Sequence, residues 1–134
     1  MIKEDYISFE TAKLLKEKGF ECEKNSTTAM YNELGVFLPL STAAEELYRD
    51  YNDFDEYDYI APTFQMAMKW LREVHGLQCD IGYDDLDWFW NIISIDKTVS
   101  IEDRPKLIKD GLAGYKTYEE ACEAAIKYCL ENLI

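Results

Sequence analysis

The sequence predicts an α+β protein, in which an antiparallel sheet of three to five strands carries three to four helices mainly on one face. Apolar residues recur with helical spacing in three segments, and they alternate with polar residues in neighbouring shorter segments. The connections between these segments are of hairpin length, which favours antiparallel pairing. The chain of 134 residues lies in the commonest size range of a single domain, so residues 1–134 are expected to form one globular domain.

The first element is a helix over residues 9–18. Ser8 is a suitable N-cap for it, and Gly19 supplies the left-handed residue that ends it. Residues 20–24 alternate apolar and charged side chains, as a half-buried strand does. Residues 29–38 predict one or two short strands interrupted at a glycine.

The second quarter of the chain predicts a short helix and an unusual acidic segment. Thr42 and Glu45 form a capping box, from which a helix should run to about Asp50. Residues 48–59 then interleave five acids with aromatic side chains, and this segment matches no structural motif.

A third helix is predicted from Pro62, a residue that suits the first helical position, to His75, with Gly76 ending it. Its spacing places five apolar residues on one buried face: Phe64, Ala67, Met68, Leu71 and Val74.

Two alternating segments after this helix predict a β-hairpin with a definite register. Pairing Tyr83 with Trp88 across a four-residue loop places Ile81 opposite Trp90. One face then carries Leu77, Cys79, Ile81, Tyr83, Trp88, Trp90 and Ile92, and the other carries Gln78, Asp80, Gly82, Phe89, Asn91, Ile93 and Ile95. The alternation favours the first face, with both tryptophans, as the core. If helices cover only that face, the other is left as a partner surface or a homodimer contact.

The C-terminal part predicts a long connection over residues 96–114, with one helical turn near residues 106–110. Thr117 and Glu120 form a second capping box and open a final helix to about Asn132. Its expected buried stripe consists of Tyr118, Ala121, Cys122, Ala125, Ile126, Cys129 and Leu133.

The net charge of the chain makes some kinds of binding partner less probable than others. With 27 acidic and 14 basic residues the net charge is −13, which disfavours direct binding of nucleic acids and of anionic membranes. The simplest explanation of this charge is that it keeps the protein soluble. A more specific explanation is that the protein binds a partner protein with a basic surface. The N-terminal residues resemble no export signal, no apolar run is long enough to span a bilayer, and the four cysteines form no CxxC pair, so a cytoplasmic location is expected.

Three segments, ISFETAKLLKEKGF (7–20), APTFQMAMKWLREVHG (61–76) and GYKTYEEACEAAIKYCLENLI (114–134), together resemble a family of small uncharacterised proteins. That family is encoded by phages, prophages and mobile elements of gut bacteria. The resemblance implies an accessory protein that binds a host or phage component, and it implies no catalytic residue or cofactor.

The sequence does not match the common motifs for binding metal ions or phosphate groups. His75 is the only histidine, which excludes a multi-histidine metal site, and its position in a last helical turn has a structural explanation. A calcium loop starting at Asp53 would need a glutamate at its twelfth position, where Phe64 stands. No glycine-rich phosphate loop occurs, so no cofactor or metal is expected.

The leading hypothesis is therefore a non-enzymatic protein that binds a basic partner surface through two acidic segments. The candidate contact residues are Tyr48, Tyr51, Asp53, Asp55, Glu56, Tyr57, Asp58, Asp84, Asp85 and Asp87. A sharper alternative is a nucleic-acid mimic that inhibits a DNA-binding protein, which would need carboxylates spaced along one face. The competing class is a small carboxylate-dependent enzyme with Asp80, Asp85 or Glu73 close to His75.

Overall fold

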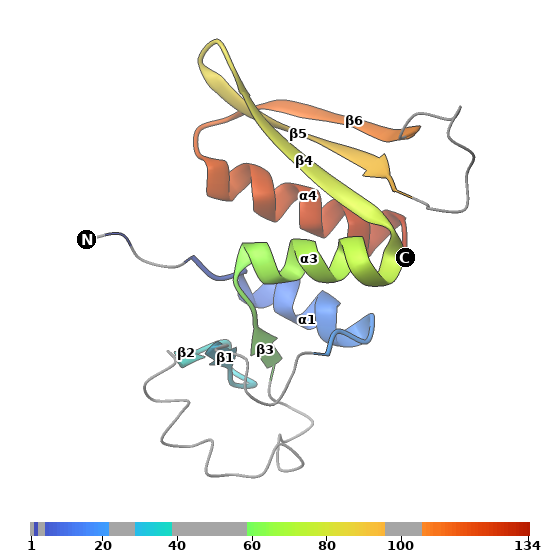
Figure 1. Ribbon diagram of the computed structural model, residues 1–134. Helices are drawn as coiled ribbons and strands as arrows, with labels where there is room; N and C mark the ends of the chain where they lie inside the picture. Colours follow the sequence, from blue (N-terminus) through green and yellow to red (C-terminus); the bar gives the residue numbers. More distant parts are fainter. Residues whose placement is uncertain (1, 3–4, 22–28, 39–58, 96–105) are drawn as a thin grey trace. The chain divides into compact units, whose positions relative to one another are not determined.

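The computed structural model describes residues 2, 5–21, 29–38, 59–95 and 106–134, and the chain divides into two compact units, residues 1–63 and 64–134 (Figure 1). The described residues form three helices and two three-stranded antiparallel sheets, which confirms the α+β class. The expectation of a single sheet is wrong, because each unit has a sheet of its own. One domain for the whole chain stays a prediction.

Unit 1 contains helix α1 (Phe9–Glu17) and strands β1 (Ala29–Tyr31), β2 (Phe37–Leu38) and β3 (Tyr59–Ala61), with strand order β2-β1-β3. Both strands predicted within residues 29–38 are therefore confirmed. The predicted start of the helix is confirmed too, since the Ser8 side chain accepts a hydrogen bond from the backbone N–H of Thr11 at 3.3 Å.

Aromatic side chains link the helix of unit 1 to its sheet. The ring of Phe9 lies 5.5 Å from that of Tyr31 and 5.4 Å from that of Tyr59. The Tyr31 hydroxyl donates a hydrogen bond of 2.7 Å to the carbonyl of Ile7, just before the helix. These edge and tilted contacts hold helix and sheet together with a specific geometry.

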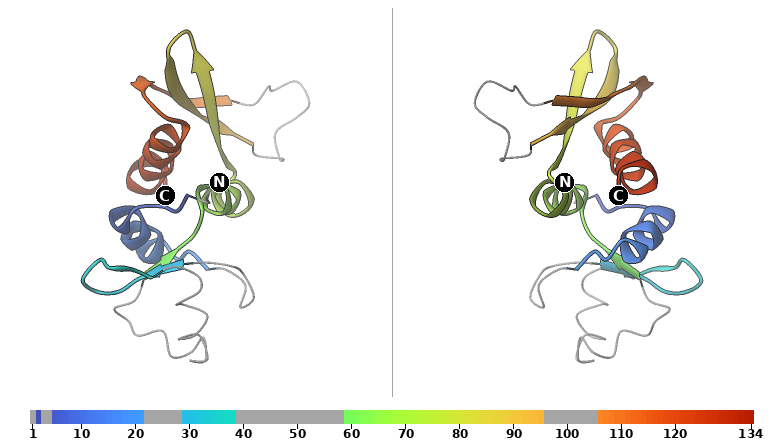
Figure 2. Two further views of the ribbon diagram at one scale, coloured as in Figure 1. Left: turned by 90° about the vertical axis from the view of Figure 1, so that its left-hand side faces the viewer. Right: turned by 90° about the vertical axis from the view of Figure 1, so that its right-hand side faces the viewer.

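Unit 2 contains helix α3 (Phe64–His75), strands β4 (Leu77–Asp84), β5 (Asp87–Ser94) and β6 (Lys106–Tyr115), and helix α4 (Tyr118–Asn132). The strand order is β4-β5-β6, and both neighbouring pairs are antiparallel. Helix α4 packs against all three strands, whereas α3 packs against β4 and α4 (Figure 2).

The β4–β5 hairpin has the predicted register. Tyr83 pairs with Trp88 and Ile81 with Trp90, without any shift along the hairpin. The loop is two residues shorter than expected, because Asp84 also pairs with Asp87. Asp85, in the two-residue turn, has φ +52, a left-handed conformation that aspartate tolerates better than most residues.

The face that was predicted to be the core is the one that the helices of unit 2 cover. Trp90 is only 3% exposed, its indole N–H donates to the Tyr115 hydroxyl at 3.1 Å, and its ring lies 5.2 Å from that of Tyr128. Trp88 is half-buried against Tyr118. The buried side chains that complete this core come from both sheet and helices: Ala67, Met68, Leu71, Leu77, Cys79, Ile92, Ala121, Cys122, Ala125, Ile126, Cys129 and Leu130.

The predicted connection over residues 96–114, with a helical turn near residues 106–110, is wrong for its second half. Residues 106–115 form the ten-residue strand β6, which pairs along the free edge of β5. Three register shifts interrupt this pairing, so the apolar alternation that would have marked a strand is broken in the sequence. The central irregularity requires a glycine at position 111, since a Cβ there would lie 1.8 Å from the Trp90 carbonyl oxygen.

The helix predictions need smaller corrections. Helix α3 begins at Phe64, two residues after Pro62, and Val74 is 61% exposed and so is not part of the buried face. In α4, Tyr118 and Leu133 are only half-buried, and Leu130 takes the place expected for Leu133 in the core. The errors at Val74 and Leu133 lie in a last turn, where the packed surface ends before the helix does.

Several predicted features lie outside the described residues, wholly or in part. The helix from Thr42 to about Asp50 lies wholly outside, and so does the acidic segment apart from Tyr59, which is in β3. Of the strand expected over residues 20–24, only Phe20 and Glu21 are described, and neither is in a strand.

Replacing Gly111 by alanine should lower the free energy of unfolding by about 2–4 kcal/mol, because the new Cβ must displace backbone atoms of β5. Gly114→Ala is the matched control. It has no atom within 4 Å of its Cβ but a φ of +100, so backbone strain alone should cost about 1–2 kcal/mol. Urea unfolding of both variants measures the difference, and equal losses would contradict the close approach of β6 to Trp90.

Candidate functional site

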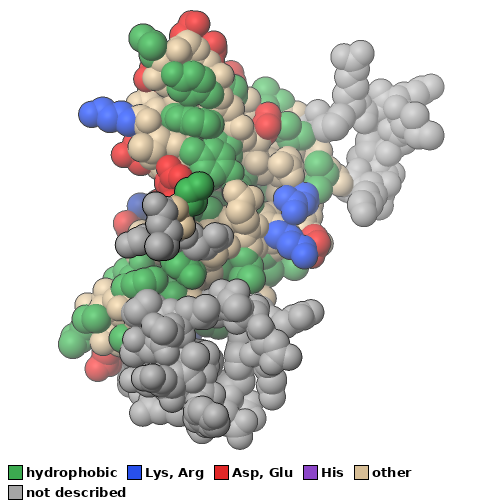
Figure 3. Space-filling view, turned by 60° about the vertical axis from the view of Figure 1, so that its left-hand side comes forward, with side chains coloured by type: hydrophobic (Ala, Val, Ile, Leu, Met, Phe, Trp, Pro, Cys, Tyr) green, Lys and Arg blue, Asp and Glu red, His purple; other side chains and the backbone are tan. Residues whose placement is uncertain are grey.

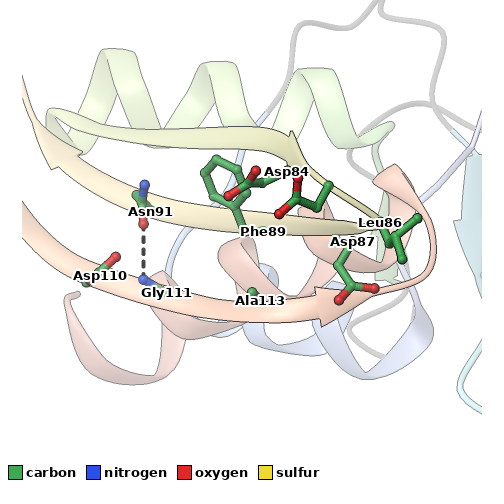
Figure 4. Close-up of a pocket in the computed structure, with 9 residues that line it drawn as sticks. Asp84, Leu86, Asp87, Phe89, Asn91, Asp110, Gly111 and Ala113 are labelled. Atoms are coloured by element: carbon green, nitrogen blue, oxygen red, sulfur yellow. Dashed lines mark hydrogen bonds between the residues drawn. The ribbon is translucent and has the colours of Figure 1, made fainter.

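The sheet of unit 2 has one face that neither of its helices covers, here called the outer face. The register places on it the side chains that alternate with the core residues. They are Gln78, Asp80, Gly82, Asp84, Asp87, Phe89, Asn91, Ile93, Leu107, Asp110 and Ala113. In Figure 4 this face is toward the viewer, with the helices behind the sheet.

Every charged side chain described on the outer face is an aspartate. Asp80, Asp84, Asp87 and Asp110 are all exposed. Lys109 of β6 has its register partner in the core set, and its amine lies over the Tyr128 ring at 5.8 Å from the ring centroid. Among the described side chains of this sheet, the outer face therefore carries negative charge and no cation.

A hollow of about 450 Å³ lies on the outer face next to the hairpin turn (Figure 4). Its apolar part is formed by Phe89 and Ala113, and its polar part by Asn91 and aspartates. Its full lining is Asp84, Asp85, Leu86, Asp87, Phe89, Asn91, Asp110, Gly111 and Ala113. Figure 3 shows carboxylates together with exposed apolar side chains at the end of unit 2 where the hairpin lies.

Small residues on both sides of Phe89 produce this shape. A Cβ on Gly82 would lie 2.3 Å from the ring of Phe89, so the ring leans over β4 at the place where a side chain is missing. On the other side of Phe89, the small side chain of its register partner Ala113 leaves space open. The Gly111 N–H, which the register shift leaves outside the regular ladder, donates to the Asn91 side-chain oxygen at 3.2 Å.

The structure brings together the described part of the predicted contact set. Asp84, Asp85 and Asp87 all line the hollow. The other seven predicted contact residues, from Tyr48 to Asp58, lie outside the described residues. Phe89, Asn91 and Ala113 were missed as contact residues, although the hairpin register had already placed the first two on the outer face. Asp110 had no such signal, because its strand was not predicted.

None of the three carboxylates proposed for an enzyme, Asp80, Asp85 and Glu73, hydrogen-bonds to the buried Nε2 of His75, and Asp80 is exposed on the outer face. Asp85 follows the far end of β4, roughly 25 Å from His75 at about 3.3 Å per strand residue. Glu73 is exposed and lies 3.9 Å from the Lys69 amine. His75 is in the last turn of α3, as predicted, with its ring 4.7 Å from Trp70. Its buried Nε2 makes no hydrogen bond to any described residue.

The cysteines of unit 2 belong to the core. The sulfur atoms of Cys79 and Cys129 lie 4.0 Å apart, and this hydrogen bond, together with burial, raises the pKa of Cys79 far above its ordinary range. Burial raises the pKa of the Cys122 thiol to about 11. All three thiols are buried, and a thiol without access to solvent is a poor nucleophile and a poor metal ligand.

Within the described ranges, no three residues of the histidine, cysteine, aspartate and glutamate types are arranged to hold a metal ion. Nor does any helix described in the chain combine the length and the apolar character needed to cross a membrane.

Comparisons with known proteins add no family to this picture: no family model matches the chain, and no curated protein or solved structure gives a significant match.

The raised pKa of Cys122 predicts a loss of stability at alkaline pH. The unfolded thiol, with an ordinary pKa of 9.0, releases its proton before the folded one, whose pKa is about 11. The stabilisation is therefore complete below pH 9 and is lost as the pH rises towards 11, by about 2–3 kcal/mol at most from this thiol.

Cys122→Ala should make this alkaline decline shallower, whatever the variant loses at neutral pH through its smaller side chain. Urea unfolding of both proteins over pH 7–11 measures the two slopes. If the free energy of unfolding fell with pH equally steeply in both proteins, the Cys122 thiol would have the same pKa in the folded and the unfolded state.

Proposed function

We propose that this chain is a non-catalytic protein-binding module, and that it binds a basic surface of a partner protein through the outer face of β4, β5 and β6. The observation that carries the proposal is the composition of that face. Phe89 and Leu107 are exposed or half-buried apolar side chains at separate places on it, and all the charged side chains described on it are aspartates.

The charge supports a cationic partner in two ways. A net charge of −13 attracts basic proteins over several ångströms, which speeds encounter at low salt. At contact, Asp84, Asp87 and Asp110 are exposed carboxylates that can accept hydrogen bonds from lysine or arginine side chains.

The apolar part supports a protein partner over a small ion. Lysine and arginine carry long apolar stems, which can cover Phe89 and Ala113 while the charged ends reach the aspartates. The half-buried Phe89 ring also attracts a cation placed over its face. Leu86, 85% exposed in the turn, adds further apolar area at the rim of the hollow.

The two alternatives have less support from the described residues. A nucleic-acid mimic would concentrate its carboxylates on one face, but exposed acids also lie on both helices of unit 2 and in unit 1. A carboxylate enzyme would bring its acids close to His75, but Asp85 lies beyond the far end of β4, and Asp80 and Glu73 are exposed and make no hydrogen bond to His75 Nε2. An accessory binding role agrees with what the family resemblance implies, and a contribution of residues 48–58 to the same partner stays a prediction.

The test is binding of a basic, partly apolar peptide to the full chain and to a variant with the outer face neutralised. Asp80→Asn, Asp84→Asn, Asp87→Asn and Asp110→Asn together should weaken binding at least tenfold in low salt, because they remove every described charge of the face. Raising the salt from about 50 to about 300 mM should weaken the unaltered protein similarly. Titration calorimetry or fluorescence anisotropy measures both effects.

A variant with the same change in net charge serves as the control. Asp5→Asn, Glu17→Gln, Glu21→Gln and Glu33→Gln remove four exposed acids from unit 1 and should leave most of the affinity. Equal losses in both variants would show attraction by net charge alone, and no binding at either salt would remove the proposed function.

A further inference from the structure

We propose that the partner binds as an extended segment that adds a fourth strand to the free edge of β4, with basic and apolar side chains in alternation. This inference rests on the proposed function and specifies its mode. Strand addition of this kind gains affinity from main-chain hydrogen bonds and specificity from alternate side chains.

The hairpin register shows which backbone groups of β4 are free. Asp84 and Asp87 flank a two-residue turn and form its closing hydrogen-bonded pair, so the even-numbered residues of β4 bond to β5. The N–H and C=O groups of the odd-numbered residues therefore point to the other edge, where no described strand pairs with β4. In agreement with this, the carbonyl of Cys79 accepts a hydrogen bond from the Gln78 side chain at 3.2 Å.

The two edges of this sheet differ in their suitability for another strand. Strand β6 has three register shifts along its pairing with β5 and two glycines in its sequence, which are features that discourage pairing at an edge. Strand β4 has eight residues paired to β5 without a shift. Its half next to the turn is accessible, since Ile81 is half-buried and Tyr83 is 58% exposed.

The side chains along this edge indicate which residue types the added strand should have. Asp80 and Asp84 lie on the outer face, so the strand's residues on that side should be lysine or arginine. Ile81 and Tyr83 lie on the opposite face, where the Tyr83 ring packs 5.1 Å from that of Trp88. Apolar or aromatic residues of the added strand would extend this row.

A second copy of the chain fits the same edge less well than a basic extended segment does. Two β4 edges paired antiparallel about Gly82 would place Asp80 of each copy opposite Asp84 of the other. Like charges directly across a strand pair are destabilising, and both copies carry a net charge of −13. In this register the facing aspartates oppose a homodimer, and the net charge of both copies adds to the repulsion, whereas a cationic strand is attracted.

The test uses the full chain and a peptide of about eight residues in which lysine alternates with valine, long enough to follow the free half of β4. Two versions carry N-methyl groups on alternate residues, in opposite phases. The phase that removes the N–H groups facing β4 should weaken binding at least tenfold, and the other phase should bind as the parent peptide does. Amide hydrogen exchange of Ile81 and Tyr83 should slow at least tenfold when the parent peptide binds.

The outcomes separate this mode from the proposed function. Asp80→Asn with Asp84→Asn, beside the edge, should weaken the parent peptide more than Asp87→Asn with Asp110→Asn, which change the same charge elsewhere on the face. If both pairs weaken it equally and both N-methylated phases bind, the peptide lies across the outer face, so strand addition is overturned while the proposed function stands. A dimer at micromolar concentration, with protected Ile81 and Tyr83 amides and no peptide, would overturn the heterologous strand.

Discussion

The phase of the β4–β5 hairpin is the constraint on which the rest of unit 2 depends. Because side chains alternate along a strand, one turn decides which set faces the helices. The turn at Asp85 and Leu86 pairs Asp84 with Asp87, and this phase sends Cys79, Trp90 and Ile92 into the core. A slip of one residue would bury aspartates and expose the tryptophans, at a cost far above the few kilocalories that stabilise a domain.

The same phase makes the two faces of the sheet chemically opposite. The core face has large apolar side chains whose polar atoms find partners, as the Trp90 N–H does in the Tyr115 hydroxyl. The outer face needs no such packing, and it carries aspartates around Phe89. Glycines at positions 82 and 111 matter for both faces, since one makes room for the Phe89 ring and the other lets β6 approach the backbone of Trp90.

Elements with a regular local pattern could be predicted from the sequence, and those stabilised by distant partners could not. The caps at Ser8 and Thr117 and the hairpin register were predictable because each depends on residues close in the chain. Strand β6 was not, because its bulges break the alternation and its glycines have low β-propensity. Its place is determined by the open edge of β5 and by the Asn91 side chain, which bonds to Gly111.

Because strand β6 was not predicted, only part of the candidate site could be recognised in the sequence. The acids of the turn were conspicuous in the sequence, but a run of acids alone is typical of any solvated loop. Their significance comes from Asp110 and Ala113, which β6 brings beside Phe89 from more than twenty residues away. A surface that spans three strands is a property of the sheet, so it becomes visible only when the last strand is placed.

The aspartates at the edge of β4 have two effects that are seldom combined: they prevent uncontrolled strand pairing, and they leave the edge open to a suitable strand. A straight, unbulged edge strand is a template for uncontrolled pairing, and proteins commonly protect such edges with charge. Asp80 and Asp84 give this protection against a second copy paired about Gly82, since each would then meet a carboxylate of the other chain. The same two charges attract a strand that carries lysine or arginine at alternate positions. Charge on an edge strand can thus determine which sequence may pair with it, without closing the edge to all.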